Sequence, residues 1–223
     1  MQGEISLSGK EVELIEYPRN VDLGNFITHG AGALFFVAGF VFMLMKAADT
    51  VQYVSVILYG VSLCAVYVMS SVYHFLPCCE AKRRARLFDH CMVPLLIAGT
   101  ATPCSLLILS DISIHHGLFV LIVSWSCTAF GIFTRLFFFE KLKNLTVGVY
   151  IVSGIMMFVS VIPVMQYIKD GIFEKMLSGS ALYLTGAVFC LMGVRRPWLH
   201  VIFHLFVLAG SAVHFYAVYT YML

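Results

Sequence analysis

The sequence predicts an all-α polytopic membrane protein: a bundle of seven transmembrane helices with its N-terminus in the cytoplasm and its C-terminus outside. Three observations predict this fold, namely an apolar composition, seven long apolar runs and a one-sided distribution of Lys and Arg. Hydrophobic residues make up 61% of the 223 residues and charged residues 12%, and the mean hydropathy is +0.92. A soluble domain of this size leaves too many positions facing water to bury so much apolar surface, so lipid is the expected solvent.

Each apolar run is close to the ~20 residues that an α-helix needs to cross the hydrocarbon core. The runs are Phe26–Met45, Val51–Tyr73, Phe88–Leu109, Leu118–Phe138, Leu145–Ile168, Met176–Val194 and Trp198–Met222. They are too long for the strands of a lipid barrel, which leaves the helix as the spanning element. Because the connections are short, we expect one membrane domain over residues 23–223, preceded by a cytoplasmic N-terminal segment, residues 1–22.

The orientation follows from the positions of the basic residues. Eleven of the 14 Lys and Arg residues fall on the N-terminal side of the predicted spans, in the N-terminal segment and in the loops after spans two, four and six. They are Lys10, Arg19, Lys82, Arg83, Arg84, Arg86, Arg135, Lys141, Lys143, Arg195 and Arg196, against Lys46, Lys169 and Lys175 on the other side. Cytoplasmic loops are enriched in Lys and Arg, so the N-terminus is predicted inside. The near balance of 14 basic and 12 acidic residues gives no reason to expect a nucleic-acid partner.

The last span carries two histidines on one helix face. His200 and His204 are four residues apart, a spacing that places their side chains about 5–6 Å from each other. Two neutral imidazoles spaced in this way can chelate one zinc ion. The alternative is a pair of interior histidines that hydrogen-bond to hydroxyls or carbonyls. Histidine-rich coordination favours zinc over iron or manganese without excluding either metal.

Spans two and three bring further polar groups to the same depth. Span two ends with Ser70 and His74 on one face, and span three begins with Asp89. In the predicted orientation both lie at the cytoplasmic side, together with the histidines of span seven. We therefore expect His74 to complete a three-histidine zinc site, with Asp89 as a ligand directly or through a water molecule. The alternative for Asp89 is an ion pair with Arg86 or a neighbouring residue.

Four other residues have roles that the sequence leaves open. His29 shares a face with Asn25 and Thr28 at the start of span one. Its two alternative roles are support of the metal site and simple packing. His214 lies about 15 Å beyond His204 along the helix, too far to share the metal, and Ser211 is its candidate partner. Cys78 and Cys79 are expected as reduced cytosolic thiols, with a second metal site or a redox switch as alternatives.

These motifs resemble the hemolysin III branch of the progestin and adiponectin receptor family, over nearly the whole chain. Residues 25–30, Asn-Phe-Ile-Thr-His-Gly, are similar to the opening motif of that branch, and Ser70 to His74 resembles the family's Ser-x-x-x-His. Phe88-Asp89-His90 together with residues 98–103 is similar to the third-span signature, with Ala101 where an aromatic residue is usual. His200 to Phe206, followed by His214-Phe215, resembles the seventh-span pattern.

The resemblance implies a seven-helix bundle with the N-terminus inside and a zinc ion bound by His74, His200 and His204. It implies further that Asp89 holds a zinc-bound water and that Ser70 lies close by. The family is similar to alkaline ceramidases, which hydrolyse lipid amides; its bacterial members carry the name hemolysin, and its animal members include hormone or lipid receptors. The short chain and the hemolysin-type motifs suggest a protein of the bacterial inner membrane.

The leading hypothesis is an intramembrane hydrolase that cleaves the amide or ester bond of a lipid, with Zn²⁺ as cofactor. In this hypothesis Asp89 is the general base and Ser70 binds the developing oxyanion. The expected partner is a membrane lipid or a fatty-acid-like ligand. One alternative is a hemolysin-type protein that perturbs membranes or forms pores. Another is a non-catalytic lipid or zinc sensor, in which the metal only links spans two, three and seven. The sequence does not decide whether the protein is an enzyme, and it leaves the substrate and the oligomeric state open.

Overall fold

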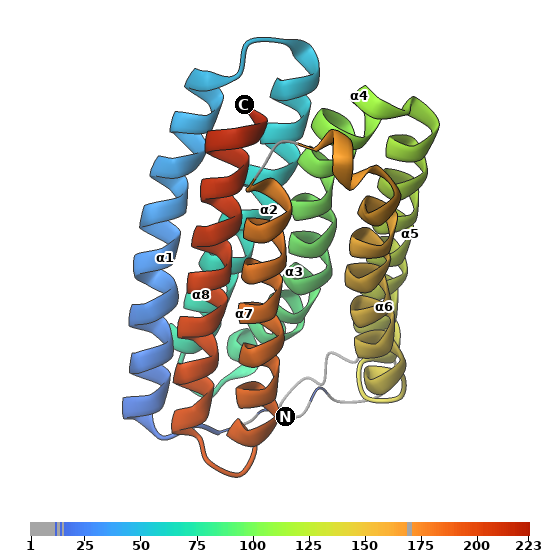
Figure 1. Cartoon of the computed structure of the whole chain (residues 1–223). Helices are drawn as coiled ribbons and strands as arrows, with labels where there is room; N and C mark the ends of the chain where they lie inside the picture. The colour runs from blue at the N-terminus through green and yellow to red at the C-terminus, as the bar shows by residue number, and fades with distance from the viewer. Residues whose placement is uncertain (1–11, 13, 15, 169–170) are drawn as a thin grey trace.

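The computed structural model describes residues 12, 14, 16–168 and 171–223, and all regular structure within these ranges is helical (Figure 1). The long helices are α1 (Arg19–Lys46), α2 (Thr50–Phe75), α3 (Glu80–Cys104), α5 (Ile114–Phe138), α6 (Lys143–Val161), α7 (Ile172–Gly193) and α8 (Trp198–Ala217). Short pieces continue them: the π-helical η1 (Ser105–Leu109) and η3 (Val218–Met222), α4 (Ser110–Ile112), and the 3₁₀-helix η2 (Ile162–Tyr167). Within the described residues, seven helical stretches are long and apolar enough to cross a membrane, which confirms the predicted fold.

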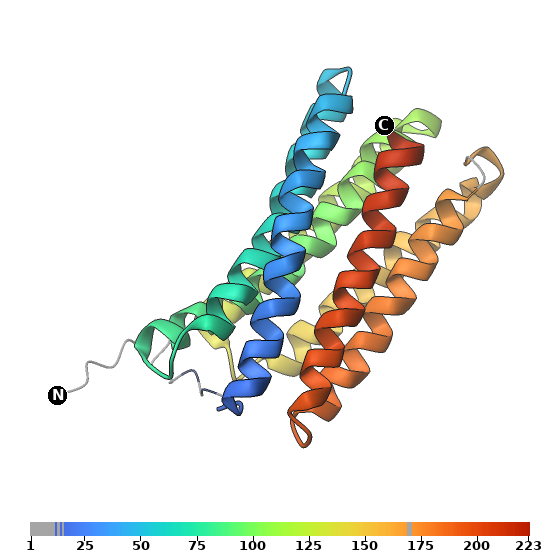
Figure 2. The same ribbon diagram turned by 90° about the vertical axis from the view of Figure 1, so that its left-hand side faces the viewer.

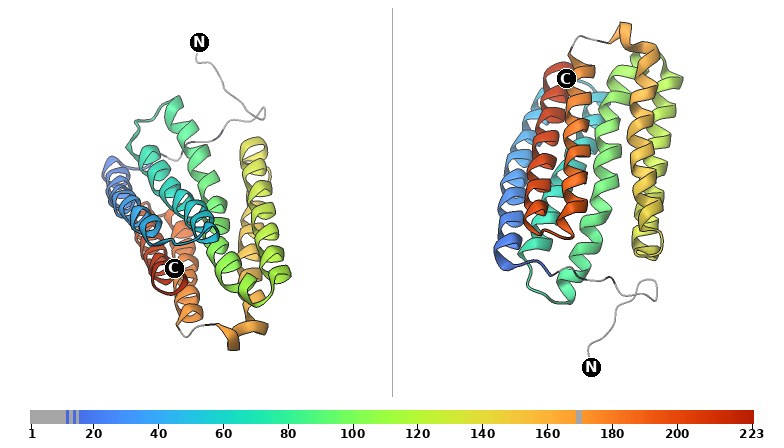
Figure 3. Two further views of the ribbon diagram at one scale, coloured as in Figure 1. Left: turned by 90° about the horizontal axis from the view of Figure 1, so that it is seen from above. Right: turned by 60° about the horizontal axis from the view of Figure 1, so that its bottom comes forward.

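The helices follow one another around the bundle. Helix α1 packs on α2, α2 on α3, α3 on α5 and α5 on α6, whereas α7 packs on α8 and α8 returns beside α1. Figure 2 shows α1 and α8 running side by side, and Figure 3 shows the α5–α6 pair on one side of α3. Helices α1, α3 and α8 begin at one end of the bundle, where α2 and α5 finish; we call this the N-terminal end. Which end faces the cytoplasm stays a prediction.

Several helices begin well before the apolar runs predicted as spans, α1, α3, α5 and α7 among them. Helix α3 begins at Glu80 rather than at Phe88, so the basic cluster predicted as a loop forms the first two turns of this helix. Glu80 stabilises these turns through ion pairs with Arg83 and Arg84, which lie three and four residues further along. Helix α1 likewise begins at Arg19, inside the predicted N-terminal segment, and α7 begins four residues before Met176. A search for apolar runs does not detect charged helical turns at the ends of a span. Lys10, Lys169 and most of segment 1–22 lie outside the described residues.

The interior of the bundle is both closely packed and polar, while large apolar side chains such as Leu34 face outward, 78% exposed. Gly179 of α7 and Gly210 of α8 let these two helices approach closely, since a Cβ at Gly210 would lie 2.9 Å from the Gly179 carbonyl oxygen. The Tyr67 hydroxyl of α2 donates a hydrogen bond to Ser211 Oγ of α8 (2.7 Å), and the Tyr183 hydroxyl of α7 bonds the same atom (2.7 Å). These contacts fix the rotation of α8, whose histidines therefore face inward.

Candidate metal centre

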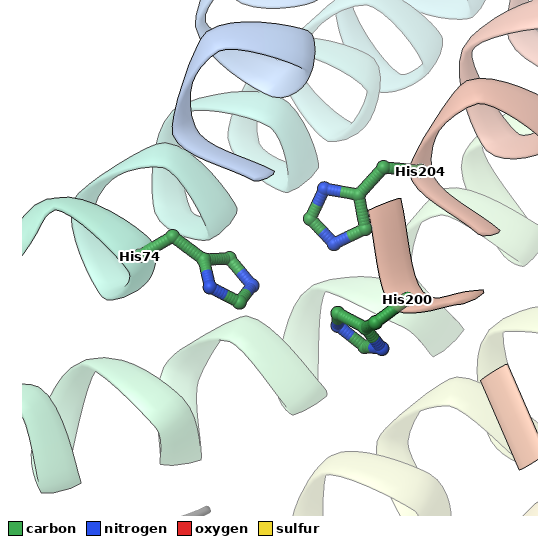
Figure 4. A group of neighbouring side chains, drawn as sticks. All are labelled: His74, His200 and His204. Carbon is green, nitrogen blue, oxygen red and sulfur yellow. The ribbon is translucent and has the colours of Figure 1, made fainter. Parts of the chain in front are cut away.

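Three histidines from two helices converge at the N-terminal end of the bundle (Figure 4). His74 lies in the last turn of α2, and His200 and His204 lie in the first two turns of α8. One ring nitrogen of each residue lies within 4.8 Å of those of the other two, close enough to hold one metal ion. The ring centroids are 5.5 Å (His74–His200), 5.0 Å (His74–His204) and 4.9 Å (His200–His204) apart. Packing of both α2 and α8 against α1 thus unites residues 126 positions apart in the chain, from 74 to 200.

Two of these histidines present a nitrogen with no protein partner. His74 Nε2 and His204 Nδ1 are buried and make no hydrogen bond among the described residues. An unsatisfied polar atom inside a protein generally costs about 1–3 kcal/mol, so a ligand that binds a buried nitrogen of this kind removes a cost. Neutral imidazole nitrogens are the usual protein ligands of zinc. The donor set therefore fits a three-histidine metal site.

Asp22, a residue absent from the predicted site, orients His74. His74 Nδ1 donates to Asp22 Oδ1 over 2.8 Å, and the second carboxylate oxygen accepts from Lys82 Nζ at 2.6 Å. The His74 side chain is 0% exposed and that of Asp22 15%, so this hydrogen bond is largely shielded from water. With the proton held on Nδ1 by a carboxylate, Nε2 keeps its lone pair free for a metal.

Asp89 and Ser70 contact each other beside the histidines. Asp89 does not belong to the group of three histidines whose nitrogen atoms lie close enough together to hold one metal ion. Its carboxylate instead accepts a hydrogen bond from the Ser70 hydroxyl. The ion pair with Arg86, which was the alternative for Asp89, is not formed among the described residues. Asp89 therefore has a polar partner without being neutralised by a cation.

Aromatic rings enclose the three histidines. His29 of α1 stacks on His204 with a centroid distance of 3.7 Å, and both of its nitrogens are buried without a hydrogen-bond partner. Tyr17, which precedes α1, stacks on His200 at 5.0 Å and lies 5.8 Å from the ring of His74. Burial raises the pKa of the Tyr17 phenol well above its usual range, so this ring covers the histidines as a neutral group.

The other residues whose roles the sequence left open do not belong to this centre. His214 Nε2 lies 3.0 Å from the Met176 carbonyl oxygen and donates a hydrogen bond to it. The prediction that Ser211 is the partner of His214 is therefore wrong, and the Ser211 hydroxyl is hydrogen-bonded to two tyrosines instead. Cys78 and Cys79 are exposed free thiols. Neither belongs to a group of potential metal ligands within the part of the chain that the structure describes.

Sequence reasoning missed Asp22, Tyr17 and Lys82. A signal for Asp22 was present, because Asp22, Asn25 and His29 recur at helical spacing and form a polar face at the start of an apolar helix. Lys82 was assigned to a loop, where burial against a carboxylate is not expected. Tyr17 precedes the first span and follows no pattern, so only the folded chain shows its position over His200.

Comparison with known proteins gives the family of the chain. A family model described as haemolysin-III related matches residues 18–215. The chain is 32% identical over 203 residues to the hemolysin-3 homolog of Bacillus subtilis (strain 168), covering 90% of this chain and 93% of that protein. It is 31% identical over 205 residues to hemolysin-3 of Bacillus cereus, covering 91% and 92%. It is also 26% identical over 206 residues to the human monocyte to macrophage differentiation factor, covering 89% and 83%.

The extent of these matches agrees with the motifs, since the family model includes all three histidines of the centre and the Asp22, Ser70 and Asp89 positions around it. The seven membrane-spanning helices show an integral membrane protein, and the bacterial relatives support its expected location in a bacterial plasma membrane. The chain belongs to the haemolysin-III related family, in the hemolysin III branch of the progestin and adiponectin receptor family that its motifs resemble.

Proposed function

We propose that this protein is a zinc-dependent intramembrane hydrolase that cleaves the amide or ester bond of a membrane lipid. The observation that carries the proposal is the convergence of His74, His200 and His204, with His74 Nε2 and His204 Nδ1 buried and unpartnered. Three protein ligands leave one zinc position open, the arrangement typical of catalytic rather than structural sites. When bound, zinc supplies a Lewis acid that polarises a carbonyl group and lowers the pKa of a water molecule to about 7.

Asp89 and Ser70 are the residues to which we assign the proton and oxyanion chemistry. The Asp89 carboxylate, outside the ligand group, takes the proton of the attacking water as its oxygen bonds to the carbonyl carbon. The same proton passes to the nitrogen or oxygen of the leaving group as its bond to that carbon breaks. Ser70 holds the Asp89 carboxylate through its hydroxyl and, once a substrate is bound, can donate to the developing oxyanion instead.

A small apolar cavity of about 20 Å³ lies between α3, α6 and α7. Its lining includes Met157 and Phe158 of α6 and Phe173 and Met176 of α7. The Met176 carbonyl bonds to His214, which lies ten residues beyond His204 on α8, so the pocket is nearer the opposite end of the bundle. We propose that a lipid enters from the bilayer with its scissile bond at the histidines. We also propose that the histidines lie at the cytoplasmic side, as the distribution of Lys and Arg predicts.

Metal content tests the first part of the proposal. The wild type, His200→Ala/His204→Ala and the control His115→Ala/His116→Ala are purified in detergent and analysed for zinc and other metals. His115 and His116 begin α5 at the opposite end of the bundle, so their removal matches the loss of two histidines without touching the centre. We expect close to one zinc per chain in the wild type and the control, and none in the variant of the centre. Absence of metal from all three would overturn the proposal.

Lipid turnover tests the second part. Zinc-loaded protein in vesicles is incubated with a panel of lipid amides and esters, and the released fatty acid is measured. Asp89→Asn should abolish release while keeping the zinc, whereas the exposed Asp111→Asn should leave it unchanged. No release by zinc-loaded wild type would leave the metal with a structural or sensing role. Dye leakage from vesicles that persists after chelation would favour the pore-forming alternative.

A further inference from the structure

Two buried arginines lie on one aromatic ring at the N-terminal end of the bundle. Arg86 belongs to the second turn of α3, and Arg135 to the last turn of α5, just before Phe139. Their guanidinium carbons lie 5.3 Å and 5.2 Å from the centroid of the Phe139 ring. The residues are only 8% and 6% exposed. Two like charges are thus brought from different helices to the same desolvated place.

Neither arginine has an anionic partner among the described residues. Among the residues that the structure describes, the acidic members of the ion pairs are Asp22 and Glu80, and no ion pair includes Arg86 or Arg135. Arg86 Nη1 and Arg135 Nε are buried and make no hydrogen bond. Asp89 acts on Arg86 only through its electrostatic field, and its carboxylate is hydrogen-bonded to Ser70. Each guanidinium therefore has at least one buried donor, Arg86 Nη1 or Arg135 Nε, that meets no protein acceptor, although the Tyr150 hydroxyl interacts with Arg135.

A buried guanidinium cannot escape this cost by losing its proton, as a lysine or histidine can. The face of Phe139 compensates part of the charge through cation–π attraction, but it offers no acceptor for the N–H groups. An unpaired charge at the end of a membrane span is costly, and two such charges repel each other. An anion between the helices removes both penalties together. Guanidinium groups match phosphate oxygens in geometry, with two parallel hydrogen bonds each.

We propose that Arg86 and Arg135 bind the phosphate group of an anionic phospholipid between α3 and α5, beside Phe139. The pair lies where these two membrane helices begin and end, which is the level of lipid headgroups. Basic pockets between transmembrane helices at this level are typical headgroup sites. This binding site uses none of the three histidines and does not depend on the zinc proposal. It places a bound lipid one helical turn from Asp89, since Arg86 precedes that residue by three positions.

Thermal unfolding of the purified protein in a neutral detergent tests the site, with three additives compared: phosphatidylglycerol, phosphatidylcholine and inorganic phosphate. The variant is Arg86→Gln/Arg135→Gln, and the control is Arg195→Gln/Arg196→Gln, which removes two exposed arginines from the same end. We expect phosphatidylglycerol, and not phosphatidylcholine, to raise the Tm of the wild type and the control saturably. The variant should need at least roughly tenfold more of the lipid for the same rise.

Stabilisation by phosphatidylglycerol without an effect of inorganic phosphate supports a lipid as the source of the bound phosphate group. Stabilisation by inorganic phosphate alone supports the anion site and overturns its assignment to a lipid. An equal response of the variant and the wild type, or no response of the wild type, overturns the site. If Arg86→Gln/Arg135→Gln does not fold, Arg86→Lys/Arg135→Lys replaces it, since lysine keeps the charge and loses the paired geometry. Native mass spectrometry of the wild type then gives a second readout: a retained phospholipid that the lysine variant loses supports the proposal, and no retained phospholipid refutes it.

Discussion

Replacing Asp22 with Asn or Ala measures how strongly a carboxylate outside the ligand set supports the proposed zinc site. Asp22 binds His74 Nδ1 at 2.8 Å, with both side chains largely excluded from water. Losing such a partner of a ligand histidine typically lowers metal affinity about 10–100-fold, or roughly 1.4–2.8 kcal/mol. In Asp22→Asn the amide oxygen can still accept from Nδ1, so we expect a loss near the lower limit. Asp22→Ala removes the acceptor altogether and should approach the upper limit.

The assay is competition between metal-stripped protein in detergent and a chromogenic zinc chelator of known affinity. Both Asp22 variants also leave the buried Lys82 ammonium without its carboxylate, so Lys82→Met is the control. That variant keeps the Asp22–His74 hydrogen bond and should bind zinc almost as tightly as the wild type. Thermal unfolding of the metal-free proteins shows whether the variants share one fold. Wild-type zinc affinity in Asp22→Ala would refute the reasoning, because His74 would then need no carboxylate to be oriented.

Three other substitutions test helix packing, two of them deeper in the bundle and one beside the histidines. Ser211→Ala should lower the unfolding free energy in detergent by about 1 kcal/mol, because two tyrosine hydroxyls lose their shared partner; an unchanged transition would show that the network contributes nothing. Gly179→Ala should destabilise by roughly 1–3 kcal/mol, since the new Cβ would meet a histidine ring of α8. Its control Gly154→Ala, where a Cβ meets nothing within 4 Å, should unfold like the wild type, and equal effects would contradict the close helix contact. His29→Phe should keep its zinc, because His29 lies outside the ligand group; loss of metal on elemental analysis would place it among the ligands.

The depth of the site was predictable because topology alone determines it. Once seven spans are counted, the end of span two and the beginnings of spans three and seven must lie on the same side of the membrane. His74, His200 and His204 therefore share a layer whatever the details of packing, and the structure does bring them together. The role of Asp89 stays a prediction, since the structure places it beside Ser70 and outside the ligand group.

The depth of a residue in the membrane does not determine how its helix is rotated or which residues its side chain contacts. Asp22 reaches His74 only because α1 and α2 pack together, with α1 beginning about two turns before its apolar run. Arg86 and Arg135 were both counted with the basic loops, yet α3 begins early enough to include Arg86 and Arg135 lies in the last turn of α5, and both are buried against Phe139. A count of charges treats each of these residues as solvated, and it cannot show that two of them meet in a desolvated place.

By itself the sequence determined the fold class and the layer of the site, because lipid requires every span to be an apolar helix and strict alternation of direction then sets each residue's depth. Only the tertiary structure decided which polar groups touch. Contacts such as Asp22–His74 and Tyr17–His200 join positions far apart in the chain or outside any repeat. They depend on how the helices are rotated against one another. The packing of small and polar side chains between helices determines this rotation, and the apolar pattern along a single helix does not.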